Sequence, residues 1–520
     1  MTASGDVNIT ILDGGGSQVQ VPLSSVQAVI GWCSAGTPNA ITATTSPTTL
    51  ATACGYGIGV EAAALSCVQG SVVLFCPVAL TNKGTATSVT KTGSNGSSVM
   101  TVTLDGTNGA WDDYLVKVIP AVAGTIGGPP TAIQVSLDNG RNYGPPIALG
   151  IASTYAIPNT GITLNFAAGT LGIGDVYTFG TSGPNISVGG IQAAITALVN
   201  SQYGVVGWGS MHIVGNVGAT GTAGIPTGAH GADMTAIEGY LDTAATVAGG
   251  QVFTRSFLSA RDASPPSTFG GTGESETSWI NALNADTSNV SAKRLCVGAG
   301  NWNMPSAFSN AGAGTPAYRR NIAWAAAAKE TTVPPQNHIG RVSDGAMPQI
   351  SIFAQDASDG FIYHNEAVNG GLDYKTTGTG GRFMTTRLRR KKPGVFITNP
   401  LLMAPFGSSF WMLPYGSVID VACDIMVQVG DEFVNEDIRL NPNGTIFNTD
   451  ASNLEQIFEG AINTAMLANN MISPGTSVVV DRTNNVNVTG VVNWSLTIVA
   501  RGYILTEQGT IAFANAQAAA

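Results

Sequence analysis

Few residues in this chain have the types and spacing that catalysis or metal binding requires. Its four histidines, His212, His230, His338 and His364, do not lie in an HExxH or another metal-ligand spacing. The chain has neither a GxSxG nucleophile elbow nor the glycine-rich phosphate-binding loop that ends in Gly-Lys-Ser/Thr. The glycine-rich run 55–59 lacks GxGxxG spacing, and no good strand precedes it, so it indicates a flexible loop. We therefore expect no enzyme, no metal site and no cofactor.

The cysteines also suggest packing rather than chemistry. None of the six forms a CxxC pair, which makes a zinc site a weak interpretation. Four of them lie in the first 80 residues, but spacing alone does not establish disulfides. We predict buried free thiols. The residues are Cys33, Cys54, Cys67, Cys76, Cys296 and Cys423.

The composition of the chain narrows its class. Of its 520 residues only 10% are charged, against roughly 25% in a typical soluble protein, while 44% are hydrophobic. The surface of a protein with so few charged residues is either coated with Ser, Thr, Asn and Gly or covered by other subunits. A net charge of −10 argues against direct nucleic-acid binding, which needs a basic face. No apolar run approaches the roughly 18 residues of a membrane span, and the start shows no visible secretory signal.

The hydrophobic periodicity divides the chain into segments, and its length predicts two to four domains. Val7, Ile9 and Ile11 alternate with other residues before the glycines Gly14, Gly15 and Gly16, which indicates a strand-like arm. A buried strand is expected at 26–31. The Thr/Gly/Ser-rich stretch 85–184 has short alternating runs and no helical period, so it predicts an inserted all-β domain.

After residue 186, helices and strands alternate as in an α/β layer. Helices are expected at 191–198, 234–247 and 318–329, and strands at 204–208, 251–254 and 293–297.

The last third predicts two more helices and a set of closing strands. The first helix, 418–433, leads into the acidic residues Asp431, Glu432, Glu436 and Asp437. The second, 454–471, has Ser452 or Asn453 as its expected cap. Strands are expected at 478–480 and 491–499. A final strand-like segment contains Tyr503, Leu505, Ile511 and Phe513 after the hinge candidate Gly502.

A basic cluster stands out against this sparsely charged background. Six of the chain's 22 basic residues lie within eleven positions. They are Arg382, Arg387, Arg389, Arg390, Lys391 and Lys392. Either they form a solvated strand edge or turn, or they bind an acidic partner surface.

Several segments together resemble the contractile tail sheath proteins of bacteriophages and related contractile injection systems. The strand and Gly-Pro loop at 29–39 are similar to the family's early strand and loop. The proline-preceded, alanine-rich segment 315–328, followed by 333–337, is similar to another family motif, although Pro335-Gln336-Asn337 departs from the family's Pro-Ala-Asn loop. The amphipathic helix and valine-rich strands at the end follow the family's closing order.

The resemblance implies an α/β (α+β mixed) sheath core with an inserted all-β domain and extended terminal strand arms. It implies an N-terminal linking arm at 1–24, a core at 25–84 and 185–390, and an outer β domain at 85–184. A C-terminal sheath domain facing the inner tube would span 391–500, and a second linking arm 501–520. The arms would add strands to sheets of neighbouring subunits.

The function that the resemblance implies is that of a structural subunit, assembled in the host bacterial cytoplasm and carried in the virion as part of the phage tail. Its expected partners are further copies in a helical sheath of stacked rings, an inner tail tube protein, and baseplate and tail terminator proteins. Neither nucleic acid nor membrane insertion is expected. Two alternatives stay open: a secreted or virion β-rich adhesin or tailspike that binds or degrades carbohydrate, and an unrecognised hydrolase, because the members of a triad need not be close in sequence.

Overall fold

The computed structural model describes residues 25–140, 142–217, 230–246, 251–261, 274–305, 317–350, 372, 381–405 and 407–504. The chain divides into two compact units, Met1–Gln428 and Val429–Ala520. The positions 390 and 391, between which the sequence suggested a domain boundary, form the turn of a hairpin in the first unit.

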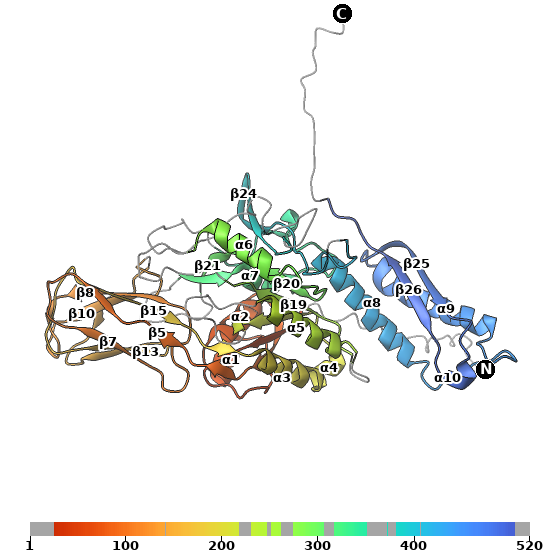
Figure 1. Cartoon of the computed structure of the whole chain (residues 1–520), viewed down its shortest axis with the longest axis horizontal. Coiled ribbons are helices and arrows are strands. Elements are labelled where there is room, and N and C mark those ends of the chain that lie inside the picture. The colour runs from red at the N-terminus through yellow and green to blue at the C-terminus, as the bar shows by residue number, and fades with distance from the viewer. Residues whose placement is uncertain are drawn as a thin grey trace, which may run out of the picture. The chain divides into compact units, whose positions relative to one another are not determined.

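The first unit is built on a six-stranded sheet (Figure 1). Only the edge strand β2 is antiparallel to its neighbour, and the other pairs are parallel. In spatial order the strands are β2 (Thr42–Thr44), β3 (Val72–Pro77), β1 (Val26–Gly31), β17 (Ser210–Val214), β19 (Arg255–Ser259) and β20 (Leu295–Gly298).

Helices cover both faces of this sheet, which is why β1, β17 and β20 are buried along their whole length. All six residues of β1 are buried: Ala28 and Ile30 pack into one core, and Val29 packs into the other. The first core receives α3 (Val188–Val199), α5 (Gly231–Ala244) and α6 (Glu276–Asp286). The second core receives α1 (Pro47–Cys54), α2 (Ile58–Val68) and α7 (Ile322–Glu330). The α/β layer expected after residue 186 is therefore confirmed.

Local capping explains where the sequence prediction failed. The strand expected at 204–208 is wrong, because the structure has the helical turn α4 (Gln202–Val206) there. Ser201 Oγ accepts the N–H of Tyr203, and Gly207 ends the turn with a φ of 78°. The strand β17 starts only at Ser210.

The alanine-rich helix also begins later than expected. Ala317–Asn321 forms strand β22, which pairs with β21 (Asn301–Pro305), and Asn321 caps the following helix by accepting the N–H of Ala323. All nine residues of α7 are buried against the sheet and α2. Alanine is suited to this position because it allows the backbones to approach closely.

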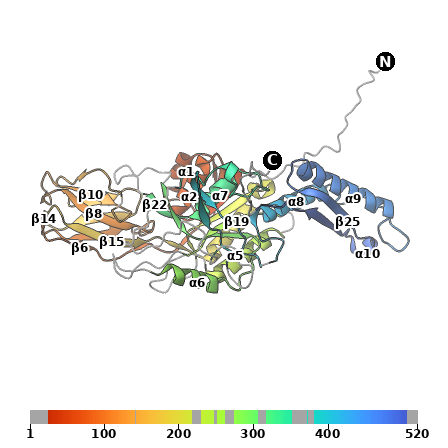
Figure 2. The same cartoon turned by 90° about the horizontal axis from the view of Figure 1, so that it is seen from above.

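Residues 85–182 form only strands and loops among those the structure describes, and we call this segment the β module. One sheet joins β5, β6, β8, β10, β11 and β15, and a second joins β7, β12 and β13, as Figure 2 shows in part. The bounds are β5 (Thr85–Ala86), β6 (Thr90–Thr92), β7 (Met100–Leu104), β8 (Leu115–Val122), β9 (Gly124–Thr125), β10 (Ala132–Ser136), β11 (Ile147–Ala148), β12 (Thr154–Ile157), β13 (Ile162–Phe166), β14 (Thr170–Leu171) and β15 (Val176–Ser182). The module has its own hydrophobic core, to which Val118, Leu164 and Tyr177 belong.

A small charged centre links the β module to the helical layer. The guanidinium group of Arg320 contacts Glu61 Oε2 at 2.6 Å and Asp112 Oδ2 at 2.5 Å. Trp32 of the sheet region meets Trp111 of the module edge to face, with ring centroids 6.5 Å apart. The short strands β4 (Leu80–Asn82), β16 (Asn185–Ile186) and β18 (Asn216–Val217) form a three-stranded sheet beside the module's two ends.

The remaining elements lie later in the chain. They are the 3-10 helix η2 (Val342–Asp344), the hairpin strands β23 (Thr386–Arg389) and β24 (Lys392–Ile397), and α8 (Leu413–Asp431). The C-terminal unit contains α9 (Asn448–Ile462), the π-helical segment η4 (Asn463–Leu467), β25 (Ser473–Val480), α10 (Val486–Thr489) and β26 (Trp494–Val499). Helix α9 starts before Ser452 and Asn453, so the caps expected there are wrong.

The structure also describes the cysteines, the possible groups of metal ligands and the long helices. The six cysteines are free; five are buried and Cys423 is half-buried. In the part of the chain that the structure describes, no cluster of three or more His, Cys, Asp or Glu side chains has the geometry to hold a metal ion. No described helix has both the length and the hydropathy needed to cross a bilayer.

Candidate functional site

Most residues of the expected terminal arms lie outside the described part of the chain. This applies to Val7, Ile9, Ile11, Gly14, Gly15 and Gly16, and to Leu505, Ile511 and Phe513. Gly502 and Tyr503 are described: Gly502 is exposed and Tyr503 is half-buried, and neither is in a strand. The arms therefore stay a prediction from the sequence.

The sheet that precedes the C-terminal segment is a two-stranded antiparallel hairpin with a polar outer face. Strands β25 and β26 pair from Ser473↔Val499 to Val480↔Trp494, with a register shift between Ser473 and Ser477. Directly opposed residues point to the same face, so Ser477 with Thr497, and Val479 with Ser495, form the outer face. All four of these residues are exposed.

The inner face of this hairpin is covered unevenly. Helix α9 packs on β25, where Val478 and Val480 are buried. On β26, Leu496 and Ile498 are only half-buried, and Trp494 keeps 40% of its surface exposed although its ring lies 5.7 Å from that of Phe458. Phe433 packs on the other side of the cluster, 5.8 Å from Phe458. The β26 side of the hairpin thus has apolar surface that the described chain does not cover.

Two ion pairs hold the C-terminal unit together. Arg482 donates to both oxygens of Glu455 at 2.8 Å, and Glu455 also accepts the N–H of Val480 at 2.9 Å. These hydrogen bonds from Arg482 lower the pKa of Glu455. Arg439 pairs similarly with Asp450, with Nη2 2.5 Å from Oδ1. The Arg482–Glu455 pair thus contacts the end of β25 through the backbone of Val480, and neither strand carries a charged side chain of its own.

The predicted basic cluster is divided by the fold. Arg387 and Arg389 lie on β23, and Arg390 and Lys391 form the turn to β24, with Lys391 in the left-handed region at a φ of 60°. We call residues 387–392 the basic hairpin tip. Arg387, Arg390, Lys391 and Lys392 are exposed. None of the five basic side chains at the tip forms an ion pair with another described residue.

Arg382 does not belong to this tip. Its guanidinium donates to the carbonyl oxygens of Val290 and Met403 at 2.8 Å and of Thr287 at 3.0 Å. It therefore satisfies backbone acceptors inside the first unit. Within the tip, burial lowers the pKa of Arg389, and the like charge of the neighbouring Arg387 lowers it further.

The predicted acidic cluster lies in the other unit. Asp431 is the last residue of α8, so the helix ends before Glu432, Glu436 and Asp437. All four acidic residues are exposed. The expectation that the helix continues to 433 is wrong, because residues 432–435 form turns and Asn435 adopts a φ of 69°.

Sequence reasoning missed a buried ionic network beneath α8. Arg255 of β19 contacts Asp420 of α8 at 2.7 Å, and Arg294 reaches the same carboxylate at 3.3 Å and Asp242 at 2.9 Å. The available signal was a charged residue within an apolar pattern. Arg255 directly follows 251–254 and begins a strand, and Asp420 lies beside Val421 in a helix with many apolar residues.

Comparisons with known proteins give matches in structure only. No protein-family model matches the chain, and no curated protein matches it. The chain is similar to the sheath tail protein of Desulfitobacterium hafniense, with 9% identity and a TM-score of 0.42, over 95% of this chain and 100% of that one. It is similar to a sheath tail protein of Listeria innocua, with 10% identity and a TM-score of 0.40, over 91% and 94% of the two chains.

A third similar structure is the helical sheath of the anti-feeding prophage in its contracted state. The identity is 10% and the TM-score 0.44, over 99% of both chains. These three proteins belong to the class that the sequence resembles. At such identities and TM-scores no residue role passes from them to this chain.

Proposed function

We propose that this chain is a structural subunit of a contractile tail sheath. Subunits polymerise as a helical array around an inner tail tube and contract to drive the tube through the host envelope. The proposal includes assembly in the host bacterial cytoplasm, residence in the virion, and contacts with baseplate and tail terminator proteins. The sequence resemblance described above supports this function, and one feature of the structure carries it.

That feature is the C-terminal hairpin, whose two strands have no charged residue. Neither Ser473–Val480 nor Trp494–Val499 contains Asp, Glu, Lys or Arg. Among the described residues each strand pairs only with the other. Monomeric proteins usually protect unpaired strand edges with charges or coverage, and a lone two-stranded sheet is marginally stable in water. An uncharged, unpaired edge beside half-covered apolar residues therefore suits a sheet that other chains complete.

The terminal segments of the same protein are the natural source of those added strands. Residues 7–11 and 503–513 have strand-like alternation in the sequence and follow or precede glycines that allow hinging. Strand addition satisfies the backbone N–H and C=O groups of both partners. Neighbouring subunits would stay joined through such arms while their cores move as nearly rigid bodies.

The charged surfaces fit contacts with other partners. The basic hairpin tip offers five cations without a described ion-pair partner, which suits an acidic surface such as that of an inner tube or of another copy. The acidic residues Asp431, Glu432, Glu436 and Asp437 offer the opposite sign. Contraction would draw on the free energy stored in the extended assembly, so it would need no nucleotide.

Electron microscopy of the purified chain tests this proposal. The full chain should form tubes or rings, whereas deletion of residues 1–16 should leave a folded protein that does not polymerise. Circular dichroism and a cooperative thermal transition would establish folding of the deleted form. A full chain that stays monodisperse and monomeric under all assembly conditions would contradict the sheath function, and long tubes from the deleted form would contradict the role of the arm.

A further inference from the structure

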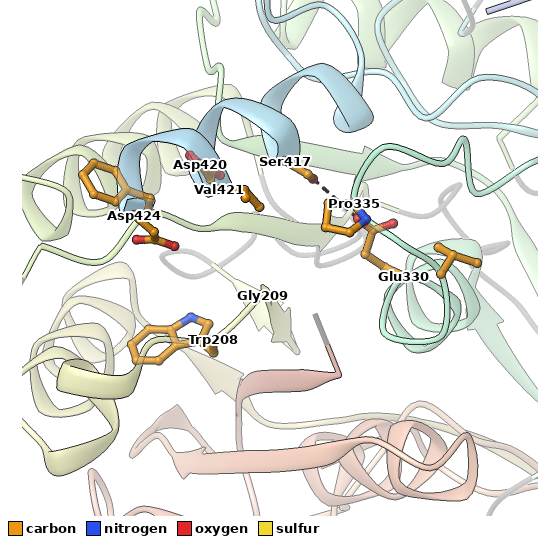
Figure 3. Close-up of a pocket in the computed structure, with 10 residues that line it drawn as sticks. Trp208, Gly209, Glu330, Pro335, Ser417, Asp420, Val421 and Asp424 are labelled. Carbon is orange, nitrogen blue, oxygen red and sulfur yellow. Dashed lines mark hydrogen bonds between the residues drawn. The ribbon is translucent and has the colours of Figure 1, made fainter. Parts of the chain in front are cut away.

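The amino ends of the parallel strands form one edge of the central sheet, and helix α8 covers part of this edge. Figure 3 shows α8 above the start of β17, with Asp424 above the Trp208 ring. A small pocket between them is also lined by Asp420, by Glu330 at the end of α7, and by Phe253. Because Trp208 and Phe253 precede β17 and β19, helix α8 covers the amino ends of these two strands.

Four valines at the neighbouring part of this edge are exposed in the described chain. Val68 ends α2 and Val72 begins β3, while Val205 and Val206 lie on the turn α4 before β17. Each has between 36% and 84% of its surface exposed. A single exposed valine is ordinary, but four on the connections into the two strands beside β1 are a concentration that burial would stabilise. We call these four residues the amino-edge valines.

The described chain begins between the two connections that carry these valines. Strand β1 lies between β3 and β17, about 5 Å from each. The N–H of Val72 donates to the carbonyl oxygen of Ser25 at 3.0 Å, and the N–H of Gly209 donates to that of Val26 at 3.0 Å. Ser25 lies in a turn, where strand β1 has not yet begun. Residues 1–24 therefore join β1 from between the amino-edge valines.

The sequence just before β1 suits an apolar surface. Val19, Val21 and Leu23 recur at every second position, which gives an extended segment one apolar side. The range 14–24 contains no charged residue. Pro22 restricts the backbone, so less conformational entropy is lost when the segment becomes ordered.

We propose that residues 19–23 dock on the amino-edge valines of their own chain. The segment lies extended along the edge and places Val19, Val21 and Leu23 against the valines. It is tethered within two residues of the surface, so its effective concentration there exceeds that of any segment from a second copy. The linking arm then begins at the glycines 14–16 rather than at Ser25. This contact lies within one subunit and does not depend on the proposed sheath function.

Thermal unfolding of the monomeric chain tests the contact. Val205→Ser with Val206→Ser should lower the Tm of the full chain by at least about 2 °C, because both changes remove apolar surface that the segment covers. In a chain without residues 1–24 the same double change should leave the Tm unaltered, since the deletion already exposes the valines. Equal shifts in the two chains, or no shift in the full chain, would overturn the proposal.

The exposed valines of the C-terminal unit supply the matched control. Val488→Ser with Val491→Ser should give the same Tm change in the full and the shortened chain. Deletion of residues 1–16 keeps the docking segment and should leave the Tm unaltered, so loss of polymerisation in that form is separable from loss of this contact. A Tm difference that grows with protein concentration would assign the valines to a second copy, and the proposal would be wrong.

Photocrosslinking locates the contact in the full chain, even if the chain without residues 1–24 does not fold. A benzophenone amino acid at position 21 should crosslink within the monomer to residues 66–72 or 202–209, as identified by mass spectrometry of the digested protein. The same group at position 8, beyond the glycines, should give no crosslink to these two ranges. Absence of the crosslink from position 21 would show that the segment lies elsewhere.

Discussion

Arg255 on strand β19 and Asp420 on helix α8 form a buried ion pair, with Arg255 Nη1 2.7 Å from Oδ2 and 2.8 Å from Oδ1. The side chains are 2% and 9% exposed. Arg255 Nη2 also donates to the carbonyl oxygen of Gly416 at 3.0 Å. The pair therefore attaches α8 to the central sheet. Removing either partner alone would leave the other charge buried without its counterion.

We expect Asp420→Ala to lower the free energy of unfolding by about 3–5 kcal/mol, because it leaves Arg255 buried without its counterion. Chemical denaturation monitored by circular dichroism measures the loss. Asp437→Asn, on an exposed turn, is the matched control and should change stability by less than about 0.5 kcal/mol. A similarly small change for Asp420→Ala would show that water or another group replaces the carboxylate.

Charges placed on the hairpin should prevent polymerisation without unfolding the chain. Ser495 and Thr497 lie on the exposed outer face of β26, so the double change Ser495→Lys with Thr497→Lys should block addition of a neighbouring strand. Negative-stain microscopy should show loss of tubes, and thermal unfolding should stay within a few degrees.

Lysines at two exposed positions of α9, Asn453→Lys with Gln456→Lys, add the same charge to the same unit. This control protein should still polymerise. Loss of tubes in both double variants would attribute the effect to charge alone rather than to the strand edge.

We expect the basic hairpin tip to contribute to binding a partner and not to the folding of the chain. Arg390→Glu with Lys391→Glu reverses two exposed charges, so co-assembly with the inner tube should weaken while empty polymers still form. The yield of tube-filled particles by electron microscopy measures the effect. Lys83→Glu, just before the β module, with Lys117→Glu inside it changes the net charge equally and should leave that yield intact. An unchanged yield from the tip variant would refute the contact.

Stability should fall as pH rises from about 5 to 8 because of Glu330. Its ordinary pKa is 4.5, and burial raises the pKa to about 8 in the folded chain. The folded state therefore holds a proton that the unfolded state has lost, and its contribution to stability disappears as pH rises through the folded pKa.

The slope due to one such group is at most about 1.4 kcal/mol per pH unit. Denaturation at several pH values should show a flatter profile for Glu330→Gln than for the unchanged chain. Asp424, near Asp420 in the same pocket, has a similarly raised pKa, so some slope should remain in the variant. Identical profiles would show that Glu330 is ionised in the folded state.

Sequence periodicity predicted the architecture wherever burial followed a simple pattern. The spacing of Ile191, Ala194 and Leu198 predicted α3, and the mostly apolar run 26–31 predicted the buried strand β1. The strand expected at 204–208 failed because its apolar run contains Val205 and Val206, which are 84% and 62% exposed on a helical turn. In the segment 204–208, hydrophobic side chains therefore do not indicate a buried strand.

The sites were less predictable than the elements, because they depend on distant residues. The basic hairpin tip was visible as a run of charged residues in the sequence. The role of Arg382 was not, because it depends on the distant carbonyl groups of Thr287 and Met403. The pocket joins residues before β17, at the end of α7 and on α8. No local pattern connects Trp208 to Asp424, since the sheet and its crossovers bring them together.

The buried side chain of Gln27 has a consequence for the order in which the chain folds during synthesis. Its Nε2 donates to the carbonyl oxygen of Ala327 at 2.8 Å, across 300 residues, and its Oε1 accepts from Ser66 Oγ at 2.6 Å. Strand β1 therefore cannot make all of its native contacts until α7 has been synthesised and has left the ribosome. The β module, whose pairing closes between β5 and β15, can fold well before then. Strand β1 would therefore stay incompletely packed for some time after the β module had folded.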